Sequence, residues 1–252
     1  MSRVSRGFRI TGKIIKLIFF MMVFSVCGIL LWRIFSSGDP ASMKALTPND
    51  RLLGAYELYG DDMRLIRQEQ RTITSAESNY GYFSVTECVF LPESNQVQIV
   101  VRYNSSTIRS LQEDFSLAEL PDRSEELFDV TLVCATDLTP DVSEDNYGND
   151  SESVKMTRIH PVESLTASDT KNLYNYRRFV FDLEGSGIDL SSMTEDDLLL
   201  AVYCDIYYNG HIRYDEPAYG TLCLYDFESE IKEGRLHHRD EKALKAYAEG
   251  RS

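Results

Sequence analysis

The chain of 252 residues carries 26 Lys and Arg against 40 Asp and Glu, and 43% of its residues are hydrophobic. This composition is sufficient for a folded core and excludes a chain that is disordered by composition. The charge is unevenly divided, because residues 1–36 hold six basic and no acidic residues, which leaves 20 basic against 40 acidic residues, or −20, for the remainder. Such an acidic remainder is repelled by nucleic-acid phosphates and by anionic lipid surfaces, so we expect no nucleic-acid partner.

The N-terminal region contains a long apolar run. Residues 17–32 hold no charge, and apolar residues continue from 14 to 35 past Lys16 and Arg33, whose long side chains can reach lipid headgroups. As a helix, this stretch would be about 33 Å long, which matches a hydrocarbon core of about 30 Å. We therefore predict a transmembrane helix at residues 14–35 that places the chain in a membrane.

Charge around this run predicts its orientation. Five basic residues precede Leu17, whereas only three follow the run within about 20 residues. The positive-inside rule then makes residues 1–13 a basic cytoplasmic tail and the rest of the chain extracytoplasmic, as in a single-pass signal-anchor protein of the cell membrane. A cleaved signal peptide is the competing interpretation, but Trp32 and Arg33 are typical of an uncleaved interfacial anchor. Cys27 is interpreted as a packing residue of the span.

A linker and a short helix are predicted next. Residues 36–47 are rich in Ser, Pro and Asp, as linkers are. Thr47 can cap a helix that starts at Pro48, and apolar residues recur at helical spacing as far as Tyr59. Residues 63–74 fit either a helix or a first strand, so we describe 48–81 as a helix and lead-in segment.

From residue 82 the pattern changes to strands. Residues 82–91 and 97–103 predict an antiparallel hairpin, with four residues of the first strand on one face, namely Phe83, Val85, Val89 and Leu91. Residues 107–115 predict one or two helical turns, and the acidic stretch 137–153 predicts a solvated loop. Further strands are predicted at 127–136, 154–160, 173–183, 198–208 and 219–227.

Three of these predictions are specific enough to check. The alternation in 127–136 places one apolar set towards a core, namely Phe128, Val130, Leu132 and Cys134. The strand at 198–208 is apolar on both faces and is therefore expected at the centre of a sheet. Asn209 and Gly210 suit a two-residue hairpin turn.

Strands without alternating helices predict a mainly β fold, with an N-terminal transmembrane helix plus an antiparallel β-sandwich at 82–227. The sandwich is expected to be loosely immunoglobulin-like or fibronectin-like. It lacks the buried Trp of an immunoglobulin domain, because the only Trp is Trp32 in the predicted span. Residues 228–252 are mostly charged and are predicted to be a polar C-terminal tail, frayed or partly helical.

Three segments carry a resemblance. GYFSVTECVFLPESNQVQIVVRY, LFDVTLVCATDLTP and AYGTLCLYDF, which follow an anchor, resemble a group of uncharacterised single-pass membrane-anchored proteins of Gram-positive bacteria. The resemblance covers most of the outer domain. It implies a bacterial cell-surface setting and implies nothing about activity or functional residues.

Four cysteines follow the predicted span, each within a predicted strand: Cys88, Cys134, Cys204 and Cys223. They allow three disulfide pairings, and buried free thiols are the favoured alternative, so their disulfide state stays open. The sequence contains no CxxC pair and no suitably spaced His that would predict a metal site. It also contains neither a GxSxG nor an HExxH motif. We therefore assign no cofactor, metal ligand or catalytic residue.

Two classes of function remain. The first is an extracytoplasmic binding module for another envelope protein, with sheet edges and several tyrosines as contact sites: Tyr174, Tyr176, Tyr203 and Tyr207. Each of these fits core or cross-strand packing better when taken singly. The alternative is a cell-envelope enzyme, such as a hydrolase whose acidic residues converge in a cleft. The sequence favours the module and specifies neither ligand nor oligomeric state.

Overall fold

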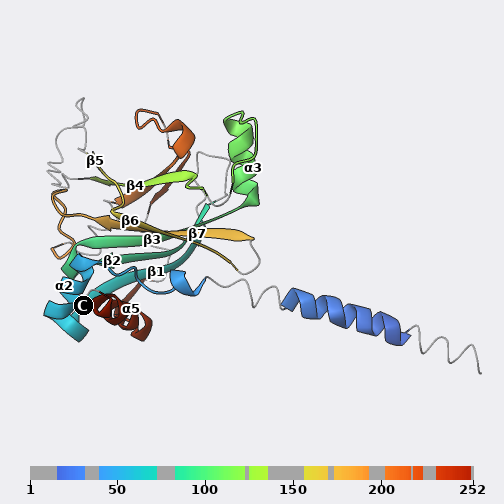
Figure 1. Cartoon of the computed structure of the whole chain (residues 1–252), viewed down its shortest axis with the longest axis horizontal. Helices are drawn as coiled ribbons and strands as arrows, with labels where there is room; N and C mark the ends of the chain where they lie inside the picture. The colour runs from blue at the N-terminus through green and yellow to red at the C-terminus, as the bar shows by residue number, and fades with distance from the viewer. Residues whose placement is uncertain are drawn as a thin grey trace, which may run out of the picture.

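The fold consists of two antiparallel sheets and a layer of helices (Figure 1). The computed structural model describes residues 16–31, 40–72, 83–122, 125–135, 156–169, 173–192, 202–216, 218–223 and 231–250. The predicted mainly β fold with antiparallel sheets is confirmed.

The larger sheet has six described strands in the order β10-β1-β2-β3-β7-β6. Their bounds are Arg64–Thr72 for β1, Phe83–Leu91 for β2, Gln96–Asn104 for β3, Glu163–Ser168 for β6, Tyr174–Asp182 for β7 and Ile231–Arg235 for β10. The predicted hairpin of β2 and β3 is confirmed, with Pro92–Ser94 as a 3-10 turn (η3) and Asn95 in the left-handed conformation at φ 49°. Residues 63–74, which fitted either a helix or a strand, contain β1.

The smaller sheet has four described strands in the order β5-β4-β8-β9. Their bounds are Phe128–Ala135 for β4, Met156–Ile159 for β5, Val202–Tyr208 for β8 and Gly220–Cys223 for β9. β8 lies between β4 and β9, which confirms its predicted central position. The predicted loop at 137–153 lies outside the described residues.

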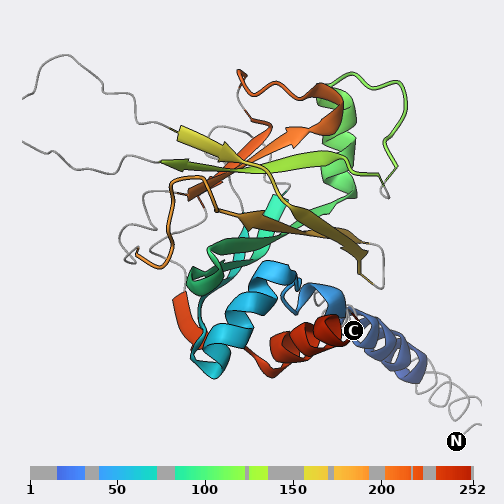
Figure 2. The same cartoon turned by 60° about the vertical axis from the view of Figure 1, so that its left-hand side comes forward.

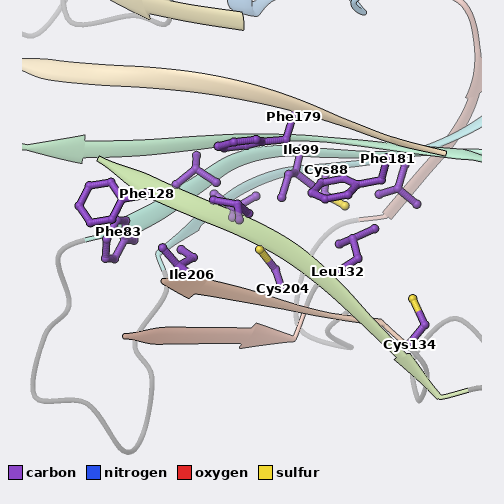
Figure 3. Packing of buried hydrophobic residues seen from close by; sticks show 14 of the residues in the cluster. Phe83, Cys88, Ile99, Phe128, Leu132, Cys134, Phe179, Phe181, Cys204 and Ile206 are labelled. Atoms are coloured by element: carbon purple, nitrogen blue, oxygen red, sulfur yellow. The ribbon is translucent and has the colours of Figure 1, made fainter. Parts of the chain in front are cut away.

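A hydrophobic core fills the space between the two sheets, so they pack face to face (Figure 3). The predicted inward face of β4 is confirmed, since its four members are at most 3% exposed. They meet inward residues of the larger sheet, and the Phe83 and Phe128 rings lie edge to face at 4.9 Å. Full burial of each large apolar side chain contributes roughly 1.5–3 kcal/mol, which makes this cluster the main source of stability.

A β-bulge in β2 changes which of its residues face this core. Val85 lies opposite Val101, but Glu87 lies opposite Val100, so Thr86 is an extra residue in the ladder. The single predicted face for β2 is therefore wrong, because alternation shifts by one residue at the bulge. Phe83 and Val85 face the sandwich core together with Cys88 and Phe90, whereas Val89 and Leu91 belong to a second cluster on the opposite face.

Helices α2 and α5 cover that opposite face of the larger sheet (Figure 2), whereas α3 packs against the sandwich core through Ile108 and Leu111. In addition to η3, the helical segments described after residue 40 are η1 (Ala41–Met43), α2 (Asp50–Tyr59), η2 (Gly60–Asp62), α3 (Ser105–Asp114), η4 (Asn209–His211) and α5 (His238–Glu249). Leu52 of α2 and Leu244 of α5 are fully buried against β1 and β2 in the second cluster. The helical turns predicted at 107–115 lie within or directly after α3, whose N-cap is Asn104.

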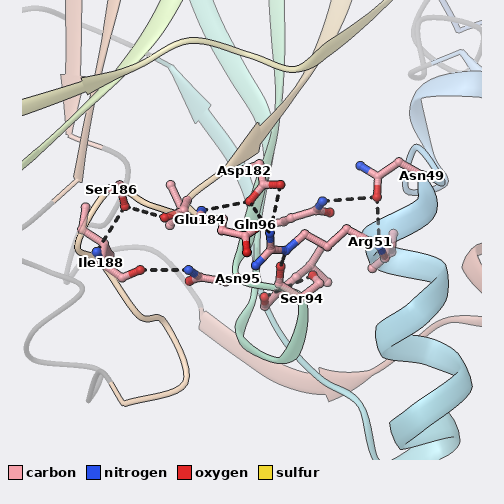
Figure 4. Close-up of polar contacts among 12 residues, drawn as sticks. Asn49, Arg51, Ser94, Asn95, Gln96, Asp182, Glu184, Ser186 and Ile188 are labelled. Carbon is pink, nitrogen blue, oxygen red and sulfur yellow. Dashed lines mark hydrogen bonds and ion pairs between the residues drawn. The ribbon is translucent and has the colours of Figure 1, made fainter.

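α2 is fixed to the sheet by polar contacts (Figure 4). Asn49, not the predicted Thr47, is its N-cap: the Asn49 Oδ1 accepts the Leu52 N–H at 2.9 Å. The Thr47 N–H instead binds the side-chain oxygen of Gln98. Arg51 donates from Nε to the Ser94 carbonyl at 2.7 Å. The short helix predicted from Pro48 is thus confirmed with its start two residues later.

The C-terminal region is partly helical, as predicted, but it is docked on the sheet and is not a frayed tail. Residues 228–252, interpreted as a polar tail, contain β10 and α5, and α5 packs through Leu244 with its Asp240 fully buried. Few apolar residues are needed, because β10 docks through backbone pairing with β1, and α5 docks through Leu244 and the buried carboxylate of Asp240. The tail therefore completes the helical layer.

The predicted turn at Asn209–Gly210 is also wrong. These residues begin the 3-10 segment η4, and β9 starts only at Gly220. Neither residue has a positive φ, and the Asn209 N–H binds the Leu127 carbonyl at 3.0 Å. This bond extends the pairing of β8 with β4 by one residue, to Leu127.

Residues 16–31 form a helix in which every residue is exposed, and Figure 1 shows it apart from the sheets. Within the described part of the chain, no helix is both long enough and apolar enough to cross a membrane. The remaining residues of the predicted span lie outside the described residues.

Candidate functional site

The face of the smaller sheet that points away from the core carries a cluster of polar and aromatic side chains. Alternation places Asp129 and Thr131 of β4 on this face, opposite Tyr207 and Asp205 of β8. We call six residues the outer-face cluster: Asp129, Thr131, Arg158, Asp205, Tyr207 and Tyr214. They come from β4, β5, β8 and the loop after η4, so only the folded sheet brings them together.

Arg158 lies at the centre of the outer-face cluster. Its Nη1 donates to the Thr131 hydroxyl at 2.7 Å and to an Asp205 carboxylate oxygen at 3.2 Å. Its guanidinium also lies over two rings, 5.2 Å from the Tyr207 centroid and 4.8 Å from the Tyr214 centroid. Cation–π contacts of this kind add to the ion pair and hold the guanidinium in one orientation.

Ring contacts and a hydrogen bond also fix the positions of Tyr207 and Tyr214. Their rings lie edge to face at 5.1 Å, and the Tyr214 hydroxyl donates to Asp129 at 2.9 Å. Burial together with this bond to Asp129 raises the pKa of Tyr214 to about 12. Burial and then the Asp205 charge raise the pKa of Tyr207. Both hydroxyls are therefore neutral donors at physiological pH, which suits binding better than proton transfer.

Part of the outer-face cluster is open to solvent. Tyr214 is 43% exposed, whereas Tyr207, which its ring contacts, is only 4% exposed. Ile212, two residues before Tyr214 in the chain, is 40% exposed. The exposed His160 ring lies 5.6 Å from the Tyr214 ring. The result is a rigid aromatic surface with charged groups of both signs, on the sheet face opposite the sandwich core.

Of the four tyrosines predicted as contact sites, Tyr207 belongs to this surface. Tyr176 is instead fully buried against Met43 and Val100. Tyr174 is half-buried with the Arg102 guanidinium 4.6 Å from its ring centre, and the Tyr203 side chain lies outside the described residues. The signal in the sequence that could have identified this surface is the set of polar residues that alternate with the core-facing residues in β4 and β8.

A second polar cluster is buried beneath the helical layer. Glu87, which the bulge turns away from the core, accepts a bond from Arg67 Nη1 at 2.6 Å and another from Arg178 Nη2. Arg67 also donates to Asp240 of α5 at 3.1 Å, and Arg178 to the Met43 carbonyl at 2.6 Å. We call Arg67, Glu87, Arg178 and Asp240 the buried charge network.

The buried charge network is electrically balanced, with two cations and two anions that are at most 6% exposed as whole residues. Burial lowers the pKa of Arg178, and the Glu87 carboxylate opposes that effect. Asp240 also accepts the backbone N–H groups of Leu46 and His237. The network thus ties the segment before α2 and the start of α5 to the sheet, which is a structural role.

Comparison of the chain with protein-family models, curated proteins and solved structures finds no match. The resemblance to membrane-anchored proteins of Gram-positive bacteria stays a prediction.

The cysteines lie mainly in the sandwich core. Cys88 and Cys204 point into it from opposite sheets (Figure 3), and Cys134 is also buried there. Cys204 and Cys134 are thiols whose pKa burial raises, that of Cys134 to about 12. Such thiols are not reactive nucleophiles. The favoured prediction of buried free thiols is thus confirmed for Cys134 and Cys204, whereas the Cys223 side chain lies outside the described residues.

One pair of acidic residues bears on the enzyme alternative. Partial desolvation first and the Asp50 charge second raise the pKa of Glu163 on β6. Asp50 in turn accepts a bond from the Tyr247 hydroxyl at 2.7 Å. Glu163 is exposed on an edge strand, whereas a hydrolase needs an enclosed pair beside its substrate.

The described histidines also lie outside any metal-binding group. Among the described residues, no three His, Cys, Asp or Glu side chains gather as a metal site would require. His211 Nε2 lies 3.5 Å from a Glu216 carboxylate oxygen at the surface. His237 precedes α5 as its N-cap residue, and the following His238 is exposed.

Proposed function

We propose that this chain is a membrane-anchored interaction module that binds another envelope protein through its outer-face cluster. The observation that carries the proposal is the stack of Arg158, Tyr207 and Tyr214 on the outer face of the smaller sheet. Tyr and Arg are the residues most enriched at binding hot spots. Their fixed geometry also favours binding, because little side-chain entropy remains to be lost.

The proposal of a membrane anchor is supported by the sequence and by one feature of the helix at residues 16–31. This helix exposes large apolar side chains on all sides, including Phe20 at 68% and Phe24 at 70%. A helix that is apolar all round needs an apolar environment. In our proposal residues 14–35 cross the cell membrane once, residues 1–13 are cytoplasmic, and the acidic sandwich is extracytoplasmic. The sandwich itself is loosely immunoglobulin-like or fibronectin-like, with one sheet covered by helices.

Site-specific photocrosslinking in the native membrane tests this function. A photoreactive amino acid at Ile212, 40% exposed beside Tyr214, is compared with the same group at Leu58, 75% exposed on α2. We expect one envelope protein to be crosslinked from position 212 and not from 58. The further substitution Tyr214→Ser should abolish that product while the protein keeps its far-UV circular dichroism.

Two outcomes contradict the proposal. The same crosslinked proteins from positions 212 and 58 would show that the outer face has no selectivity. The absence of any crosslinked protein at position 212 would show that the face is unoccupied in the membrane.

A further inference from the structure

Among the described residues, the backbone of β6 has a partner strand on one side only. β6 forms an end of the larger sheet and pairs only with β7 among the described residues. Directly after β6, the Asp169 N–H binds the Tyr174 carbonyl at 3.1 Å, in register with the strand. Because hydrogen-bonded pairs alternate along an antiparallel ladder, Leu165 and Ala167 direct their backbone groups to β7. Ser164 and Thr166 direct theirs away from the sheet.

From Ser164 to Ser168, this edge lacks the features that keep sheet edges apart; a Pro and an irregular pairing, at Pro161 and Val162, occur only before it. Exposed edges are normally protected by charged residues, Pro, bulges or covering segments. The six residues of β6, ESLTAS, include no Pro and a single charge at the first position, and five of the six are exposed. By contrast β10, at the other end of the sheet, carries three charges in the five residues IKEGR. Leu165 on β6 is an apolar side chain that is 38% exposed.

We propose that two copies of this chain pair antiparallel through β6, around a two-fold axis at Leu165. In this register Ser164 of one copy lies opposite Thr166 of the other, and their outward backbone groups meet as hydrogen-bonded pairs. Leu165 lies opposite Leu165 of the second copy, which covers the exposed side chain. The two larger sheets become one continuous sheet with an isologous interface.

Charge selects this register over the next one. With the axis at Leu165, Glu163 lies opposite Ala167 of the second copy, and no like charges face each other. A shift of two residues, with the axis at Thr166, places Glu163 opposite Asp169. Like charges directly opposite each other destabilise a strand pair. The association is independent of the proposed partner of the outer-face cluster, because it uses the other sheet.

Cysteine crosslinking of the full chain in mild detergent tests the register. Across the axis, Leu165→Cys places two thiols at a non-hydrogen-bonded pair, whose Cα separation of about 4.5 Å suits a disulfide. Ala167→Cys is the matched control, because residue 167 lies opposite Glu163 of the second copy and not opposite the second copy's residue 167. Leu58→Cys, 75% exposed on α2, measures random collision. All variants carry Cys27→Ser.

We expect Leu165→Cys to form dimers on a non-reducing gel at least about tenfold faster than either control, because an ordered pair has a high effective concentration. Thr166→Pro should abolish this crosslinking without breaking β6–β7 bonds, since the N–H it removes points outward. Leu165→Lys places two cations opposite each other at the axis. This variant should be a monomer when its mass is measured by light scattering.

The proposal is overturned if Leu165→Cys crosslinks no faster than Leu58→Cys, or if Ala167→Cys crosslinks equally fast. It is also overturned if the unmodified chain has the mass of one copy, or if Leu165→Lys leaves the dimer intact.

Discussion

The substitution Glu87→Gln tests whether the buried charge network depends on its balance. The Glu87 carboxylate pairs with Arg67 at 2.6 Å and with Arg178, whose side chains are 2% and 0% exposed. Gln keeps the shape but not the charge, so two buried cations would share the single carboxylate of Asp240. Removing one partner of a buried ion pair costs about 3–5 kcal/mol. We expect the free energy of unfolding to fall by about that amount.

Urea unfolding followed by far-UV circular dichroism measures this change. The control Glu216→Gln removes a carboxylate that pairs with Arg213 at 2.9 Å, where the side chains are 45% and 59% exposed. Exposed pairs contribute about 1 kcal/mol or less, so this variant should unfold almost as the original chain does. Adding Arg178→Met to Glu87→Gln leaves Arg67 and Asp240 as a matched pair.

The double variant should therefore be less destabilised than the sum of its single variants. A loss below about 1 kcal/mol for Glu87→Gln, or strictly additive single effects, would refute the view that these buried charges act as one balanced unit.

Two further predictions concern the helical layer and β6. Leu244→Ala should lower the free energy of unfolding by about 2–5 kcal/mol, because it leaves a cavity at a fully buried site on α5. The control Leu58→Ala, at a 75% exposed position, should change it by less than about 0.5 kcal/mol. Equal effects of the two substitutions in urea unfolding would contradict the docking of α5. The pKa of Glu163 is raised above its ordinary value of 4.5, so the folded state disfavours its charged form, and the resulting loss of stability grows as pH rises from that value through the folded-state pKa. Glu163→Gln should therefore raise the thermal midpoint at neutral pH and leave it unchanged below about pH 4; a lower midpoint at pH 7 would contradict this sign.

Several strands were predictable because their signal is local. β4 and the hairpin of β2 and β3 have apolar periodicity that matches the strand repeat, and turn residues lie between the latter two. The exception within β2 is instructive. A bulge needs one unpaired residue, and nothing in the residue types around Thr86 marks it. The place of Glu87 in the buried charge network therefore could not be predicted from the sequence.

The candidate surface was less predictable than the fold. Arg158 and Tyr214 lie in segments that the sequence separates widely, and neither has a pattern that distinguishes it from other surface residues. The tyrosines selected from the sequence included Tyr176, whose burial depends on η1 and β3 packing over it. β6 was missed altogether, because an exposed polar edge strand has no apolar alternation to detect.

The sequence by itself determined the uneven charge, the apolar run near the N-terminus and most strands of the core. These follow from composition and from periodicity over a few residues, which are properties of neighbours in the chain. Only the tertiary structure decided that α5 docks through Asp240, that Glu87 turns away from the sandwich core and that the outer-face cluster assembles. Each of these depends on contacts between residues far apart in sequence, whose free energy exists only once the sheets have formed.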